Sequence, residues 1–192
     1  MSRRCLVTGG GGFLGRRIVE MLLARGEGVR IIARGEYPEL AAIGVDCRRG
    51  DITDADLVLK ACRGCDVVFH VAAKAGVWGR YEEYHLPNVI GTQNVIDACR
   101  SSGVGRLVHT SSPSVVFSGT DMEGVNESVP YSRHYTAPYP RTKAVAEQLV
   151  LAANDGSFAT TALRPHLIWG PRDNHLVPRI VGRAASLRRI GG

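Results

Sequence analysis

The sequence predicts an α/β fold in which a doubly wound parallel sheet carries helices on both faces. Short apolar runs alternate with longer segments whose apolar residues recur at helical spacing, which is the pattern of repeated strand–helix–strand units. A glycine-rich turn joins the first apolar run to the first helical segment. The two longest loops, residues 73–84 and 112–138, follow the expected carboxyl ends of strands, where open α/β sheets bind ligands.

Each expected strand is a short apolar run bounded by turn residues. We expect strands at residues 4–8, 29–33, 45–48, 66–72, 106–110 and 160–163. Each expected helix carries apolar residues three or four positions apart, as Leu14, Ile18 and Met21 are in the first, which Gly26 ends. We expect helices at residues 13–25, 37–43, 55–62, 89–100 and 144–153.

The composition fits one globular domain that spans residues 1–192, with 44% hydrophobic residues. The net charge of +6 comes from scattered arginines, and no dense basic run with interleaved aromatic residues is present. We therefore expect no nucleic-acid partner. A positive charge of this kind suits an anionic small molecule or contact with a lipid surface.

The cysteines and the N-terminal segment favour a reducing, cytoplasmic location. The chain has 5 cysteines, opens without the apolar core of a secretory signal, and has no run approaching roughly 18 apolar residues. Cys62 and Cys65 form a single C-x-x-C without the further ligands that zinc needs, which favours structural cysteines over a redox or metal site. His166 and His175 also lack metal-ligand spacing, so we expect no metal.

The glycine-rich turn reads TGGGGFLG over Thr8–Gly15, and Gly10, Gly12 and Gly15 satisfy G-x-G-x-x-G. Between a strand and a helix, this spacing is the dinucleotide fingerprint of Rossmann-type folds, because glycines permit a tight turn, close approach of a pyrophosphate, and packing of the helix on the sheet. The N-terminus of the helix offers free N–H groups and partial positive charge to phosphate. The turn therefore predicts an NAD(P) cofactor.

The end of the second strand bears on the choice of cofactor. An acidic residue there would bind the ribose 2′-hydroxyl of NAD, but the sequence has Ala33 followed by Arg34. A guanidinium suits a 2′-phosphate, so we expect NADP(H) to be preferred, with NAD(H) possible. Solvation of Arg34, or stacking on adenine, is the alternative, and Glu36 weakens the preference.

Motifs along nearly the whole chain resemble the extended short-chain dehydrogenase/reductase family. They are TGGGGFLG (Thr8–Gly15), GDI (Gly50–Ile52), HVAA (His70–Ala73), NVIGTQNV (Asn88–Val95), TSS (Thr110–Ser112), YPRTK (Tyr139–Lys143) and LRPHLIWGPRD (Leu163–Asp173). Within that family the chain is most similar to the 3β-hydroxysteroid dehydrogenase branch. In that branch it looks closest to 2-alkyl-3-ketoalkanoate reductases and to decarboxylating sterol-4-carboxylate 3-dehydrogenases.

The resemblance implies that Tyr139 is the acid/base, that Ser112 orients the substrate oxygen, and that Asn88 helps to position the site. It also implies that Lys143 supports the tyrosine and holds the nicotinamide ribose. Tyr139 and Lys143 are four positions apart and so project from one helix face, whose first turn tolerates Pro140. We expect the neighbouring ammonium and an oxidised nicotinamide together to lower the pKa of the Tyr139 phenol from about 10.

The resemblance further implies the residues that contact the cofactor. Besides Arg34 and Lys143, they are Gly9, Gly12, Phe13, Leu14, Gly15, Asp51, Ile52, Ala72, Ala73, Pro165, Leu167 and Ile168. Lys74, Trp78 and Tyr81 lie in the loop after the fourth expected strand and are candidates to line a substrate pocket. Lys74 is either a partner for a substrate carboxylate or simply solvated.

These observations favour an NAD(P)-dependent oxidoreductase that interconverts a 3-hydroxy and a 3-keto group on a hydrophobic, sterol-like or long-chain keto-acid substrate. A nucleotide-sugar epimerase or dehydratase, and a cofactor-binding module without catalysis, are the alternatives.

Extended family members are longer than this chain, so we expect a fragment that lacks most of the C-terminal substrate region. The resemblance also implies a possible homodimer. The basic, partly amphipathic segment 176–192 predicts no spanning helix but is compatible with peripheral membrane contact.

Overall fold

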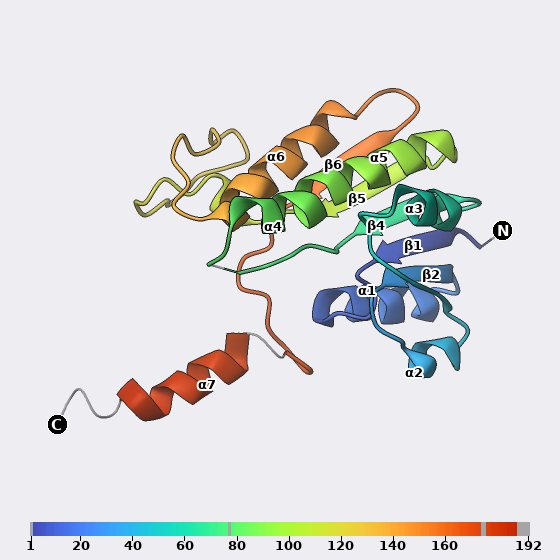
Figure 1. Cartoon of the computed structure of the whole chain (residues 1–192), viewed down its shortest axis with the longest axis horizontal. Coiled ribbons are helices and arrows are strands. Elements are labelled where there is room, and N and C mark those ends of the chain that lie inside the picture. Colours follow the sequence, from blue (N-terminus) through green and yellow to red (C-terminus); the bar gives the residue numbers. More distant parts are fainter. Residues whose placement is uncertain (1, 77, 174–175, 188–192) are drawn as a thin grey trace.

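The computed structural model describes residues 2–76, 78–173 and 176–187. Its centre is a six-stranded, wholly parallel sheet in the order β3-β2-β1-β4-β5-β6 (Figure 1). The strands are β1 Arg4–Thr8, β2 Gly28–Ala33, β3 Asp46–Arg49, β4 Val67–His70, β5 Arg106–Thr110 and β6 Ala159–Leu163. The chain starts in the middle of the sheet, winds to one edge and then returns to build the other, which confirms the doubly wound fold.

Helices cover both faces of the sheet (Figure 1). The α-helices of the described residues are α1 Phe13–Ala24, α2 Pro38–Ala41, α3 Ala55–Cys62, α4 Tyr81–His85, α5 Gly91–Ser101, α6 Pro138–Ala152 and α7 Leu176–Leu187, and α7 stands apart from the sheet (Figure 1). Apolar residues of α3, α5 and α6 form one buried cluster with alternate strand residues such as Leu6, Val68 and Leu107. The residues between these on the strands pack with α1 and α2. Each central strand is therefore buried on both sides, as parallel sheets require.

Two helices begin earlier than the sequence pattern predicts. Helix α5 is preceded without a break by α4 and a π-helical turn, Leu86–Ile90, so the helical rod begins at Tyr81 and not at Val89. Pro87 lies inside this rod, and the wider π turn accommodates the residue that would normally end an α-helix. Helix α6 begins at Pro138 and not at Ala144. Its prolines occupy the first turn, where a backbone N–H has no helical partner.

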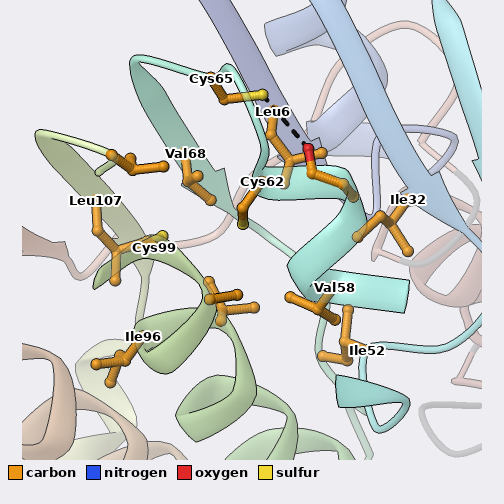
Figure 2. Close-up of a cluster of buried hydrophobic side chains, with 14 of the residues drawn as sticks. Leu6, Ile32, Ile52, Val58, Cys62, Cys65, Val68, Ile96, Cys99 and Leu107 are labelled. Carbon is orange, nitrogen blue, oxygen red and sulfur yellow. Dashed lines mark hydrogen bonds between the residues drawn. The ribbon is translucent and has the colours of Figure 1, made fainter. Parts of the chain in front are cut away.

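The C-x-x-C pair belongs to the core. Cys62 and Cys65 are buried in the same cluster as Cys99, between α3, α5 and the sheet (Figure 2). The thiol of Cys65 donates to the carbonyl of Ala61 at 3.4 Å, and burial raises the pKa of this thiol to about 11. A thiol with so high a pKa is a poor nucleophile at neutral pH, and the side chains of both cysteines pack in the core.

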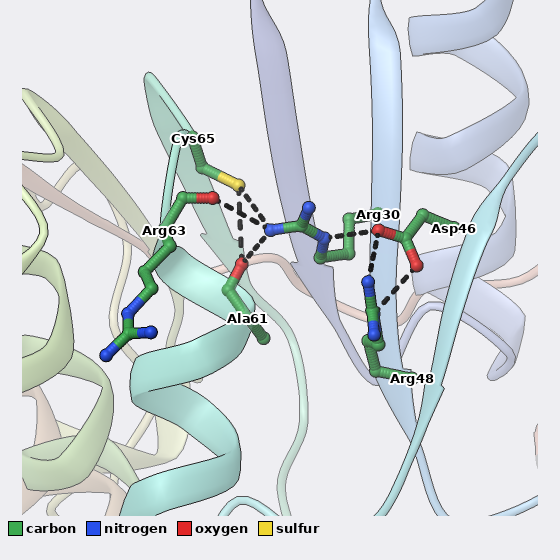
Figure 3. Close-up of polar contacts among 6 residues, drawn as sticks. All are labelled: Arg30, Asp46, Arg48, Ala61, Arg63 and Cys65. Carbon is green, nitrogen blue, oxygen red and sulfur yellow. Dashed lines mark hydrogen bonds and ion pairs between the residues drawn. The ribbon is translucent and has the colours of Figure 1, made fainter.

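Arg30 of β2 places a cation at the C-terminal end of α3, where backbone carbonyls lack helical partners. Its guanidinium donates to the carbonyls of Ala61 and Arg63, at 2.7 and 3.0 Å, where the helix ends (Figure 3). On its other side it pairs with Asp46 of β3 at 2.6 Å. A largely buried arginine thus satisfies the last carbonyls of a helix and joins that helix to two strands.

Candidate active site

The glycine turn between β1 and α1 has no room for side chains. Gly9 adopts a φ of +69°, and a Cβ on Gly15 would lie 2.2 Å from the carbonyl oxygen of Gly9. The backbone N–H of Gly12 donates to that same oxygen at 2.9 Å, which closes the turn. Gly12 is the N-cap of α1 and provides no side-chain cap, so the first N–H groups of the helix face outward unclaimed by a side chain.

Several predicted cofactor contacts lie around this turn. Ala72 lies against Gly9, since a Cβ added to Gly9 would be 3.0 Å from the Ala72 backbone. The ring of Phe13 lies beside Gly170, where the chain runs back past α1. Leu14 follows Phe13 in the first turn of α1 and is half-buried.

Residues at the ends of β2 and β3 form the next part of this edge. Arg34 is exposed directly after β2 and has no ion-pair partner in the part of the chain that the structure describes. Glu36 is paired with Arg49 at the end of β3. Asp51 accepts a hydrogen bond from the N–H of Thr53 at 3.0 Å, and Ile52 is buried. The carboxylate nearest to Arg34 in sequence is thus neutralised by another arginine.

The structure brings Ser112 and Tyr139 together. Ser112 follows β5 and Tyr139 lies in the first turn of α6, and the serine side chain lies close enough to the phenol to affect its pKa. The Ser112 hydroxyl also lies 2.8 Å from that of Ser114. Burial raises the pKa of the Tyr139 phenol, while the interaction with Ser112 acts in the opposite direction. Desolvation therefore dominates in this structure, and the lowered pKa expected from the ammonium together with an oxidised nicotinamide stays a prediction.

Lys143 is one turn along α6 from Tyr139 and only 2% exposed. Its amine donates to the carbonyl of Thr110 at 2.6 Å and lies 3.0 Å from Nε2 of His109. Burial lowers the pKa of this amine to about 7, because the charged form is desolvated, and Glu147 opposes the change. Lys143 is therefore poised to change its charge near neutral pH.

Asn88 acts on the site through the backbone. Its side chain accepts from the N–H of Lys74 at 2.7 Å and donates to the carbonyl of the same residue at 3.0 Å. It also donates to the hydroxyl of Thr142, which in turn donates to the carbonyl of Tyr139. Asn88 thus ties the loop after β4 to the first turn of α6, and its side chain is buried.

Two buried histidines belong to this site, and sequence reasoning assigned them no role in it. His70 and His109 are paired across β4 and β5, with ring centroids 5.1 Å apart. Thr92 donates to the carbonyl of Asn88 and therefore accepts from Nε2 of His70, at 2.9 Å. Thr8 accepts from two backbone N–H groups and so donates to Nδ1 of His70, at 2.8 Å. The sequence did contain a signal for both histidines, because each is a polar residue at a strand position where alternation predicts an apolar one.

The predicted cofactor contacts that follow β6 are less buried than the residues around Tyr139. Pro165 is half-buried, whereas Leu167, with a φ of +44°, and Ile168 are exposed. Ala73 is exposed as well. His166 borders a cavity of about 980 Å³ beside the outer strand β6, with apolar walls from Val116, Phe117 and Met122.

The loop after β4 differs from expectation in one respect. Lys74 is neither free nor simply solvated, since its amine pairs with Glu83 of α4 at 2.7 Å. Trp78 is 89% exposed, and its carbonyl accepts from the hydroxyl of Tyr84. Tyr81 begins α4 and lies under the guanidinium of Arg141. His175 lies outside the described residues, as do residues 188–192 of the basic C-terminal segment.

Comparison with known proteins agrees with this geometry. The family model of the 3-beta hydroxysteroid dehydrogenase/isomerase family matches residues 6–190. The chain belongs to this family. A 2-alkyl-3-oxoalkanoate reductase of Stenotrophomonas maltophilia is 55% identical to this chain, and the alignment covers 98% of this chain and 58% of the reductase. A decarboxylating sterol-4-alpha-carboxylate 3-dehydrogenase of Homo sapiens is 41% identical, over 96% of this chain and 50% of that one.

Solved structures of related enzymes share the fold. A dTDP-glucose 4,6-dehydratase from Streptomyces venezuelae, with NAD bound, matches with a TM-score of 0.83 and 29% identity, over 95% of this chain and 62% of that one. A UDP-glucose 4-epimerase from Thermus thermophilus, in complex with NAD, matches with a TM-score of 0.79 and 34% identity, over 93% and 60%. The chain spans about half the length of the curated relatives it matches. In the described ranges, no helix is long and apolar enough to cross a membrane.

Proposed function

We propose that residues 1–192 form the cofactor-binding domain of an NAD(P)-dependent oxidoreductase that interconverts a 3-hydroxy and a 3-keto group on a hydrophobic substrate. The observation that carries this proposal is that the Ser112 hydroxyl interacts with the Tyr139 phenol, closely enough to affect its pKa, with Lys143 one helical turn away. A phenol linked to a hydroxyl that can hold a carbonyl oxygen is a proton donor for ketone reduction.

The glycine turn fits a dinucleotide. Side chains are excluded at Gly9 and Gly15, and Gly12 leaves the first N–H groups of α1 without a side-chain cap, so the backbone is open to a pyrophosphate. Phe13 and Leu14 would contribute further N–H groups at this helix end. We assign the remaining cofactor contacts to Asp51, Ile52, Ala72, Ala73, Lys143, Pro165, Leu167 and Ile168, by resemblance to the family.

Arg34 supports NADP(H) as the preferred cofactor. Its guanidinium is exposed beside the turn, and pairing with Arg49 keeps the Glu36 carboxylate from repelling a phosphate there. The solved relatives carry NAD, so NAD(H) remains the alternative.

Each site residue has a distinct part in the reaction. A bound nicotinamide supplies hydride for reduction and accepts it for oxidation. Tyr139 donates its proton to the carbonyl oxygen in reduction and takes a proton from the alcohol in oxidation. Ser112 orients that oxygen, and the Lys143 ammonium stabilises developing negative charge on the phenol. Asn88 positions the first turn of α6, which carries Tyr139.

The substrate class follows the relatives. One relative is named as a reductase of 2-alkyl-3-oxoalkanoates and another as a dehydrogenase of sterol-4-carboxylates. Both names describe a hydrophobic body with a carboxylate one carbon from the reacting carbonyl or carbinol. The higher identity favours a long-chain 2-alkyl-3-oxoalkanoate, and the name of that relative favours the reductive direction.

A nucleotide-sugar epimerase or dehydratase is the second candidate, because a UDP-glucose 4-epimerase shares the fold at 34% identity. Such enzymes use their cofactor within one turnover and regenerate it. Purification of the chain with a nucleotide that survives dialysis would favour this candidate, whereas consumption of NADPH in step with substrate would favour the reductase.

The test compares wild-type protein with Tyr139→Phe and Ser112→Ala, using NADPH and a 2-alkyl-3-oxoalkanoate. We expect Tyr139→Phe to lose turnover by at least about 10²-fold and Ser112→Ala by roughly 10- to 1,000-fold, with unchanged cofactor affinity in both. Ser118→Ala, in the exposed loop after β5, is the matched control. Wild-type turnover in Tyr139→Phe would overturn the proposal.

A further inference from the structure

Lys143 is a buried cation whose immediate partners are uncharged. Its amine contacts the carbonyl of Thr110 and Nε2 of His109. Glu147, the acidic residue of the next helical turn, is taken up by other groups: Arg164 donates to it at 2.6 Å and Tyr131 at 2.9 Å. The charge on Lys143 therefore depends on neutral acceptors to an unusual degree.

The titratable groups around Lys143 come from strands β4 and β5 and from helices α4, α5 and α6. His109 on β5 contacts the amine, and His70 on β4 stacks against His109. Tyr139 and Glu147 lie on α6 itself. Of the neighbouring helices, α4 has its Glu83 paired with Lys74, and α5 has Asp97 accepting from Gln93. Among these groups, His109 is the side chain within hydrogen-bond distance of the amine.

The hydrogen bond that His109 accepts from the Lys143 ammonium determines which ring nitrogen of His109 carries the proton. When Lys143 is an ammonium, Nε2 of His109 must be bare and the proton must reside on Nδ1. Nδ1 is buried and has no hydrogen-bond partner in the described chain. An unpaired polar atom in the core costs stability, and strand alternation would place an apolar side chain here, beside Leu107 on the same face. Stability of the fold therefore does not explain the imidazole.

We propose that His109 is a positioning residue for Lys143: its Nε2 aims the amine along the carboxyl edge of β5 and sustains the ammonium form of the lysine at neutral pH. This inference rests on the proposed function, which requires a charged lysine beside Tyr139. The His109 ring remains neutral while it does so, since burial and the charge of Lys143 both lower the pKa of the imidazole. His70, held by Thr8 and Thr92, packs against the ring and keeps it in place.

The test is direct titration of the lysine by NMR. The sequence contains three lysines, Lys60, Lys74 and Lys143, so protein labelled with ¹³C at lysine Cε gives few signals, which Lys60→Arg and Lys74→Arg assign. We expect a titration midpoint of about 7 for Lys143. His109→Leu should lower that midpoint by a further one to two pH units, roughly the change when a buried charge loses a hydrogen-bond acceptor.

Two amide variants separate the hydrogen bond from the effect of losing a ring. His109→Gln places an amide oxygen near the position of Nε2, so we expect the midpoint within about half a unit of wild type. His109→Asn carries the same amide too far from Lys143 and should behave like His109→Leu. Equal Lys143 midpoints in the Gln and Asn variants would overturn the inference. This comparison tests the inference even if His109→Leu does not fold.

The titration is independent of turnover, so failure of this inference differs from failure of the proposed function. If His109 positions Lys143 and the reductase assignment also holds, the alkaline limb of the kcat/KM profile for reduction should move to lower pH in His109→Asn and not in His109→Gln. A lysine midpoint that moves while Tyr139→Phe retains turnover would keep the inference and reject the function.

Discussion

The Ser112 side chain interacts with the Tyr139 phenol, although one residue follows strand β5 and the other lies beyond a long loop, at the start of helix α6. The contact exists because α6 packs along β5 and Lys143 anchors its first turns to the carbonyl of Thr110. We propose that this arrangement makes Tyr139 a proton donor and Ser112 the group that orients a carbonyl oxygen.

Replacement of Lys143 by methionine should stabilise the fold while it removes activity. The pKa of Lys143 is lowered to about 7 in the folded chain from 10.5, so the unfolded chain binds more protons between these values, and stability rises with pH through that window. Lys143→Met removes the penalty and should gain about 1–4 kcal/mol at pH 6, with a smaller gain near pH 10. Urea unfolding at both pH values measures this. A loss of stability at pH 6 would contradict it, and Lys60→Met is the control.

Mild acid should destabilise the chain through His70. Burial lowers the pKa of His70 to about 3 from 6.5, so the unfolded chain binds more protons in this window and stability falls as the pH drops below about 6.5. Between pH 6.5 and 5, most carboxylates stay ionised, so His70 should contribute about 1.4 kcal/mol per pH unit. Urea midpoints should fall less steeply in His70→Phe than in wild type, and exposed His134→Gln should leave the slope unchanged.

Arg34 should discriminate between the cofactors. If its guanidinium meets a 2′-phosphate, Arg34→Leu will weaken NADPH binding about 10-fold or more and leave NADH binding unchanged. Quenching of tryptophan fluorescence during titration with each cofactor measures both affinities. Arg106→Leu alters an exposed arginine at the opposite end of β5 and serves as the control. Equal losses for NADPH and NADH in Arg34→Leu would refute the assignment.

Gly15 should tolerate no side chain. A Cβ there would lie 2.2 Å from the carbonyl oxygen of Gly9, and backbone cannot yield as a flexible side chain does. We expect Gly15→Ala to lose at least about 2 kcal/mol of stability or to lose cofactor binding. Gly182→Ala in α7 meets nothing within 4 Å and should be neutral or stabilising. Wild-type stability together with wild-type binding in Gly15→Ala would show that the turn is looser than the structure indicates.

The sheet could be predicted because alternating apolar runs and amphipathic segments leave few topologies, and the glycine turn marks where β1 meets α1. The starts of α4 and α6 could not, because Pro87, Pro138 and Pro140 normally argue against helix, whereas a π turn and a first turn accommodate them. The link between Lys143 and His109 was hidden as well, since it depends on which strand lies under α6. The register that pairs His70 with His109 is a property of the folded sheet and not of either strand.

We propose that Tyr139 donates a proton to the carbonyl oxygen while hydride is transferred to carbon 3. The most direct measurement supplies NADPH deuterated at nicotinamide C4 together with a 2-alkyl-3-oxoalkanoate and locates the deuterium in the product by mass spectrometry. We expect deuterium on carbon 3 of a 3-hydroxy product with wild-type protein, and at least about 10²-fold less with Tyr139→Phe. Absence of deuterium at that carbon with wild-type protein, or equal transfer by Tyr139→Phe, would contradict it.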